Sequence, residues 1–220
     1  MDASKESRAD TELRAGTAGR THLRAARGLS GAVVAATLAC IVLVAAVAPQ
    51  PPMDARDYYP TEPGDTWTFE SSVRGEFTNE VADSTVQDGA VVFRIRSTDA
   101  VGREQTLIVR HDGPRLYLGP NAESLSLLAD FGLEEGESRT VEMAGGVATT
   151  TLVARHDELD VFGTSFRDVV KVELAREGAG TQTHFFARGI GLVANESDAP
   201  PSRVRLVRAT VGGEAVGTPP

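Results

Sequence analysis

Two dipeptides in the sequence pair a histidine with an aspartate, and such pairs could ligate a divalent metal ion. They are His111-Asp112 and His156-Asp157. Imidazole nitrogens and carboxylate oxygens are both ligands of Zn²⁺ and related ions. On a strand, however, neighbouring side chains point to opposite faces, so one dipeptide cannot easily aim both groups at one ion. The favoured interpretation is turn chemistry at the ends of strands, and we expect no metal and no other cofactor.

A hydrolytic site could be assembled from Ser165, His184 and Asp168. Nothing in their spacing favours it, and the sequence around Ser165 lacks the closing glycine of a nucleophile elbow. Cys40 is the single cysteine, so the chain cannot form an internal disulfide. It lies in a long apolar segment, which argues against a catalytic thiol. We therefore predict that the protein is not an enzyme.

Aromatic side chains are the remaining candidates for ligand contacts. Trp67 is the only tryptophan, and we expect it to anchor the core, with ligand stacking as the alternative. Phe185 and Phe186 are adjacent, so on a strand one ring faces the core and the other faces a second layer or a groove. Trp67, Phe185 and Phe186 are therefore the candidate ligand-binding residues.

An uncharged apolar run covers residues 29–48. As a helix rising about 1.5 Å per residue, it would cover the roughly 30 Å hydrocarbon core of a bilayer. Six basic residues precede the run and the next cation is Arg56, so the positive-inside rule places the N-terminus in the cytoplasm. A cleaved signal peptide or lipidation at Cys40 are the alternatives. We predict a single-pass signal anchor in the cytoplasmic membrane, with a periplasmic or extracytoplasmic C-terminal domain.

Small residues recur every fourth position in this run, at Gly31, Ala35 and Ala39. Such a stripe lets a second helix approach closely. The sequence therefore suggests a weak homodimer through the membrane span, with a solitary span as the alternative.

Charge and composition place the folded domain after the apolar run. Six of the 22 basic and four of the 31 acidic residues lie before it, which leaves a net charge of −11 beyond it and argues against a nucleic-acid partner. All twelve aromatic residues lie in this later part, so the core is there. The predicted divisions are a disordered cytoplasmic arm (1–28), the anchor (29–48), a Pro-rich linker (49–57), an exported β domain (58–212) and a disordered tail (213–220).

Apolar residues beyond the linker alternate with polar ones, which is typical of half-buried strands. Turn residues such as Asp112-Gly113-Pro114 separate the segments. The exception is 123–131, where leucine spacing predicts a short helix capped by Asn121. We predict an all-β fold: an antiparallel, strongly curved sheet or partial barrel with at most a short helix. The predicted strands are 66–69, 91–96, 106–110, 115–118, 147–153, 169–174 and 203–208.

Three stretches resemble the opening and closing motifs of a bacterial family of exported or lipid-anchored proteins of unknown function. They are Tyr58-Tyr59-Pro60 with Gly64 and Trp67, then 162–172, then 185–193. The last includes an Arg-Gly-Ile-Gly-Leu-Val corner, where the family has Lys/Arg-Gly-Val-Gly-Leu-Val. Thr61 stands where the family usually has an apolar residue. The resemblance implies an all-β domain akin to the open half-barrels of periplasmic lipoprotein carriers, without a catalytic assignment.

These observations predict a non-catalytic β domain tethered outside the cytoplasmic membrane, acting as a scaffold or an envelope assembly factor. The alternative is a carrier or sensor of an apolar ligand, such as a lipid or a lipoprotein acyl chain, held in a half-barrel cavity. An exported hydrolase or metal-dependent enzyme is a third hypothesis, and the three histidines beyond the anchor are its main support.

Overall fold

The computed structural model describes residues 53–87, 89–143 and 146–217. The predicted arm 1–28 and the predicted span 29–48, with its stripe of small residues, lie outside this description. Within the described ranges, no helix combines the length and the apolar character that crossing a membrane requires.

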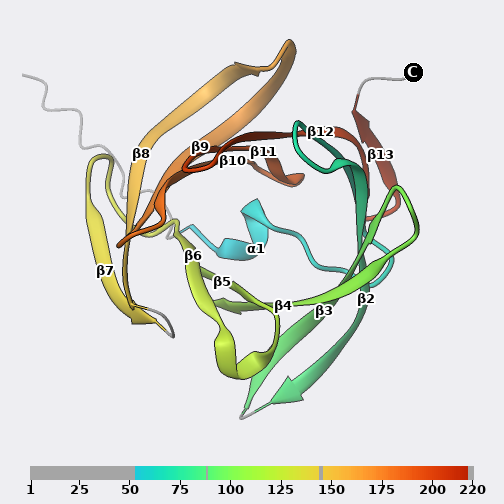
Figure 1. Ribbon diagram of the computed structural model, residues 1–220, viewed down its shortest axis with the longest axis horizontal. Helices are drawn as coiled ribbons and strands as arrows, with labels where there is room; N and C mark the ends of the chain where they lie inside the picture. The colour runs from blue at the N-terminus through green and yellow to red at the C-terminus, as the bar shows by residue number, and fades with distance from the viewer. Residues whose placement is uncertain (1–52, 88, 144–145, 218–220) are drawn as a thin grey trace, which may run out of the picture. The chain divides into compact units, whose positions relative to one another are not determined.

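Thirteen strands form one antiparallel sheet, which confirms the predicted all-β class. Its order is β6-β5-β4-β3-β2-β1-β12-β11-β10-β9-β8-β7, with β13 beside β12. Neighbours are consecutive in the chain everywhere except at β1 and β12, so two meanders meet at that pair (Figure 1). The strands are β1 (Thr66–Ser71), β2 (Gly75–Gln87), β3 (Ala90–Asp99), β4 (Glu104–Asp112), β5 (Arg115–Gly119), β6 (Ser126–Asp130), β7 (Ser138–Met143), β8 (Gly146–Val161), β9 (Thr164–Arg176), β10 (Gly180–Ala187), β11 (Gly191–Asp198), β12 (Pro201–Val211) and β13 (Glu214–Gly217).

The sheet curls into a nearly closed barrel, with β6 and β7 at its two ends (Figure 1). β6 contacts both β7 and β8, but no ladder joins β6 to β7 among the described residues. Asp130 of β6 is buried, and its Oδ2 lies 2.8 Å from Arg139 Nε of β7 and 3.4 Å from Arg115 Nε of β5. The Asp130–Arg139 ion pair therefore bridges the seam, where no backbone ladder is found, and Arg115 contacts the same carboxylate from β5.

Along the strands, buried side chains alternate with more exposed ones, and the buried side chains fill the barrel. On β9, Val170, Val172 and Leu174 are buried, while Lys171 and Glu173 between them are partly exposed. Each fully buried aliphatic or aromatic side chain contributes about 1.5–3 kcal/mol. The barrel interior is therefore a packed core. Its largest fully buried side chains are Trp67, Phe131, Phe186, Ile95, Leu116 and Leu127.

The predicted helix at 123–131 is wrong. Asn121 does cap a turn, because its side chain accepts a hydrogen bond from the Glu123 backbone N–H at 3.1 Å. That turn is a single 3₁₀ turn, η1 (Ala122–Ser124), and β6 follows it. Four consecutive residues of β6 are buried. A strand buried on both faces has a continuous apolar run, which periodicity cannot distinguish from a helix.

The folded unit also extends further at both ends than predicted. A short helix, α1 (Ala55–Tyr58), forms in what we expected to be linker, and Ala55 is fully buried. At the other end, β13 pairs with β12 where a disordered tail was expected. Gly212 and Gly213 form the two-residue turn, with φ angles of 57° and 80°. This turn chemistry is typical of a tight hairpin.

Candidate functional site

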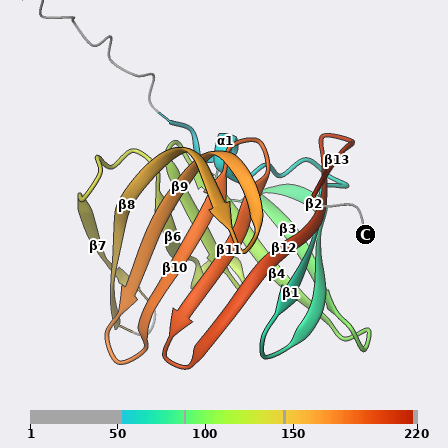
Figure 2. The same ribbon diagram turned by 90° about the horizontal axis from the view of Figure 1, so that it is seen from above.

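Helix α1 sits at one mouth of the barrel, against the turn between β10 and β11 (Figures 1 and 2). The Gly189 N–H donates to the Asp57 carbonyl at 2.6 Å, and Arg188 Nη2 lies 2.9 Å from Asp57 Oδ2. Trp67 Nε1 donates to the Ile190 carbonyl at 2.6 Å. The opening and closing motifs of the family resemblance therefore meet in space, and their contacts fix α1 to the sheet.

The three candidate ligand-binding aromatics are not gathered around one cavity. Trp67 is 1% exposed and stacks on Tyr59, with ring centroids 5.7 Å apart. Phe186 is fully buried with its ring edge-on to Phe131. Phe185 is partly buried and packs against the core. Trp67 and Phe186 are packing residues, as the favoured interpretation of Trp67 expected, and ligand contact by any of the three stays a prediction.

The two His-Asp dipeptides lie on strands that are not neighbours in the sheet, β4 and β8. The His111 ring contacts Phe93, with centroids 5.5 Å apart. In the part of the chain that the structure describes, no group of three or more His, Cys, Asp and Glu side chains is placed to hold a metal ion.

Two residues of the possible hydrolytic set, Ser165 and His184, have other partners, and among the described residues no hydrogen bond or ion pair joins the Asp168 carboxylate to either of them. Ser165 Oγ donates to Glu158 Oε1 at 2.6 Å. His184 is 6% exposed, and its Nδ1 lies 3.0 Å from Asn195 Nδ2. Burial lowers the pKa of His184 to about 4, with a smaller effect from the Arg176 cation. His184 is therefore neutral at pH 7, and its hydrogen bond is to an amide.

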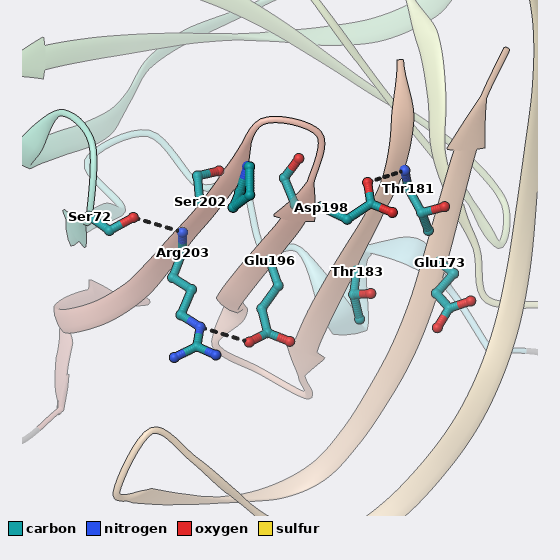
Figure 3. Close-up of a pocket in the computed structure, with 10 residues that line it drawn as sticks. Ser72, Glu173, Thr181, Thr183, Glu196, Asp198, Ser202 and Arg203 are labelled. Atoms are coloured by element: carbon teal, nitrogen blue, oxygen red, sulfur yellow. Dashed lines mark hydrogen bonds and ion pairs between the residues drawn. The ribbon is translucent and has the colours of Figure 1, made fainter. Parts of the chain in front are cut away.

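A groove of about 720 Å³ is the largest of the cavities described here, and it lies over β9–β12 (Figure 3). A row of polar side chains, one from each strand, lines it. Val172, which precedes Glu173 on β9, and His184, which follows Thr183 on β10, are both buried. Because neighbouring side chains alternate between faces, the row points away from the barrel interior. The row consists of Glu173, Thr183, Glu196 and Arg203, which the strand register places side by side.

Hydrogen bonds and ion pairs hold the groove side chains in place (Figure 3). Arg203 Nε lies 3.2 Å from Glu196 Oε1, and the Arg203 backbone N–H donates to Ser72 Oγ at 3.0 Å. The Thr181 N–H donates to Asp198 Oδ1 at 2.7 Å. The floor of the groove is therefore an ordered polar surface that can exchange hydrogen bonds with a ligand.

The long β8–β9 hairpin bounds this groove on one side. β9 pairs with β10 only as far as Val169, and beyond this residue the hairpin projects outside the curled sheet (Figures 1 and 2). Phe162 and Gly163 form its tip, both at positive φ. The Phe162 ring centroid lies 5.6 Å from the Arg203 guanidinium carbon, and both residues line a second cavity of about 280 Å³ that shares Ser72 with the groove. The two cavities therefore form one surface feature with an aromatic rim.

Sequence reasoning missed this groove. The alternating polar positions on β9 and β10 were visible, and a meander makes these strands neighbours. The missing information was the direction in which the β8–β9 hairpin folds, since its tip contacts β12 about 40 residues further along the chain at Arg203.

No protein-family model matches the chain, and no curated protein matches it. Two solved structures are similar to it. One is a predicted exported protein with a YmcC-like fold from Bacteroides fragilis: it is 14% identical, covers 72% of this chain and 98% of its own, and has a TM-score of 0.44. The other is a predicted lipoprotein from Parabacteroides distasonis, 10% identical over the same shares, with a TM-score of 0.40. At these scores neither likeness establishes a shared fold or function, and the family resemblance of the motifs stays a prediction.

Proposed function

We propose that the chain is a non-catalytic β domain, tethered outside the cytoplasmic membrane, that acts as a scaffold or an envelope assembly factor by holding an extended segment of a partner protein. The polar groove over β9–β12 is the observation that carries this proposal. Its volume of about 720 Å³ and its position on the outward face suit an extended segment better than a small enclosed ligand.

The barrel interior is packed with side chains, which favours a binding site on the outward face of the sheet over one inside the barrel. Trp67, Phe131 and Phe186 are each at most 1% exposed and occupy the inside of the curled sheet. Interiors packed to this degree have no room for an acyl chain without displacing side chains. An apolar ligand inside the barrel is therefore the weaker hypothesis, and the groove is the better candidate.

The charges in the groove support binding to a polar partner. Glu196 is paired with Arg203, and Glu173 Oε1 lies 3.6 Å from Lys171 Nζ. These pairs are partly exposed, so each can be exchanged for a pair with a partner at little net cost. Thr181 and Thr183 add hydroxyl groups that can donate and accept. A peptide backbone with polar side chains offers the matching groups.

Site-specific photo-crosslinking in cells tests the groove. With p-benzoylphenylalanine in place of Thr183, we expect a discrete crosslinked product of higher mass. The same residue in place of Thr106, an exposed position on β4, is the matched control and should give none. The Arg203→Glu substitution places a second carboxylate beside Glu196 and should lower the Thr183 product severalfold. Equal products from Thr183 and Thr106, or none from Thr183, would contradict the proposal.

Protease accessibility tests the tether. We expect protease added to intact spheroplasts to digest the C-terminal domain, because the predicted span at 29–48 would place it outside. A domain that is cut only after lysis would place it inside, and the proposed envelope role would then be wrong.

A further inference from the structure

A separate pocket of about 290 Å³ lies at the mouth of the barrel, where α1 meets β8 and β9. It is separate from the groove and plays no part in the proposed function. It gathers several ionisable groups in a smaller volume than the groove does. The side chains that matter here are those of Tyr58, Arg155, Asp157, Asp168 and Arg188.

Tyr58 brings a hydroxyl to this mouth pocket. The residue is 4% exposed, and its ring stacks on Phe131 with centroids 4.9 Å apart. No hydrogen bond to its hydroxyl is found among the described residues. Burial raises the pKa of Tyr58, against the opposing effects of Arg188 and Arg155, so the hydroxyl keeps its proton. The protonated hydroxyl can therefore donate a hydrogen bond to a ligand in the pocket.

Arg155 brings a cation without a carboxylate partner. Its Nη2 donates to the Phe131 and Leu133 carbonyls, at 3.1 and 2.7 Å. These acceptors are neutral, and within the described residues the guanidinium makes no ion pair, whereas the neighbouring Arg188 is paired with Asp57. Its Nη1 contacts the Met53 sulfur, and the Glu135 carboxylate accepts from the Arg155 backbone N–H at 2.7 Å. The guanidinium is therefore held beside the pocket without an ion pair among the described residues.

Asp168 brings the opposite charge. Its carboxylate makes no ion pair and accepts no hydrogen bond among the described residues, while its backbone carbonyl accepts from the Arg188 N–H at 3.1 Å. Asp168 is exposed, and its φ angle is 49°, in the left-handed region that aspartate and asparagine adopt more readily than most residues other than glycine. Asp157, also on the pocket wall, adds a second carboxylate.

We propose that the mouth pocket binds a small zwitterion with one ammonium group and one carboxylate or phosphate group. The anionic group lies toward Arg155 and the Tyr58 hydroxyl, and the ammonium group lies toward Asp168. The volume of about 290 Å³ is at the lower end for ligand pockets, which limits the ligand to the size of an amino acid or a phosphoethanolamine group. Only a ligand with both charges can pair with Arg155 on one side of the pocket and with Asp168 on the other.

Titration calorimetry on the purified full-length chain tests the pocket with four probes. L-alanine and O-phosphoethanolamine carry both charges and distinguish a carboxylate from a phosphate ligand. N-acetyl-L-alanine lacks the ammonium group, and L-alaninamide lacks the carboxylate. We expect saturable binding of at least one zwitterion, and binding about tenfold weaker or more for both capped probes, because each leaves one charged wall unpaired.

Two conservative variants assign the binding to this pocket. Tyr58→Phe keeps the stacked ring, and Asp168→Asn keeps a residue type that tolerates positive φ. Each should weaken zwitterion binding, by about fivefold and about tenfold respectively. Tyr117→Phe on β5 and Asp83→Asn on β2 are the matched controls and should bind as the parent does. Equal binding of capped and uncapped probes, no saturable binding, or unchanged affinity in both pocket variants would overturn the proposal.

Discussion

Replacing Trp67 by alanine should lower the free energy of unfolding by about 3–5 kcal/mol, the usual cost of truncating a large buried aromatic side chain. Trp67 is 1% exposed, stacks on Tyr59, and donates its indole N–H to the Ile190 carbonyl at 2.6 Å. A Cβ atom added at Gly191 would lie 3.3 Å from Trp67 Nε1, so backbone and indole pack closely there. The substitution therefore opens a cavity and also leaves a buried carbonyl unpaired.

Urea unfolding of the full-length chain, followed by far-ultraviolet circular dichroism, measures this effect, because the variant has no tryptophan left to report fluorescence. Trp67→Phe should cost less, about 1–3 kcal/mol, since it keeps an aromatic ring and loses the hydrogen bond. Val101→Ala is the control, because Val101 is 75% exposed in the turn between β3 and β4. An unchanged midpoint for Trp67→Ala would show that the junction between α1 and the sheet is not packed as described.

Most of the strands could be predicted from sequence because each has one buried and one partly exposed face. The segment 169–174 shows this, since its valines are buried and Lys171 and Glu173 are not. Turn residues such as Gly113 and Gly163, at φ angles of 56° and 85°, then separate the strands. These signals are local, and an antiparallel meander needs little more than local signals to be recognised.

The errors occur where burial depends on contacts with distant parts of the chain. β6 has a continuous apolar run because it is buried on both faces, and periodicity then has no polar face to detect. The Ala55 N–H donates to the Gly113 carbonyl, more than 50 residues away, and this contact is what places α1 in the folded unit. Gly212-Gly213 is a local signal for a hairpin, and the tail could have been read as β13.

The mouth pocket could not be predicted at all from the sequence. Tyr58, Arg155 and Asp168 come from three different elements, and the first two are almost 100 residues apart. The sequence drew attention to His156 for its neighbouring aspartate, whereas the structure makes the preceding Arg155 the notable residue. The environment of Arg155 has no sequence signature, because its guanidinium contacts two backbone carbonyls and the Met53 sulfur and none of these groups is charged.

Two histidines, His184, which is buried, and His111, which is partly buried, should make the domain lose stability in mild acid. Burial lowers the pKa of both His184 and His111 to about 4, from 6.5, with smaller contributions from Arg176 and Arg56 respectively. Between pH 6.5 and 4 the unfolded chain takes up protons that the folded chain does not. Stability is therefore fully present above pH 6.5 and falls as the pH drops toward 4. Each histidine accounts for a loss of at most about 3 kcal/mol.

Carboxylates also titrate in this range, so variants are needed to isolate the histidines. His184→Gln keeps a polar group beside Asn195, and His111→Gln keeps one beside Phe93. We expect each single variant to lose less stability than the parent between pH 6.5 and 4.5, by about 1–3 kcal/mol, and the double variant to combine both effects. Urea midpoints at half-unit steps of pH measure the slopes. Parallel slopes for the parent and the double variant would mean that both imidazoles take up protons in the folded chain, and hence that neither is shielded from water by the barrel.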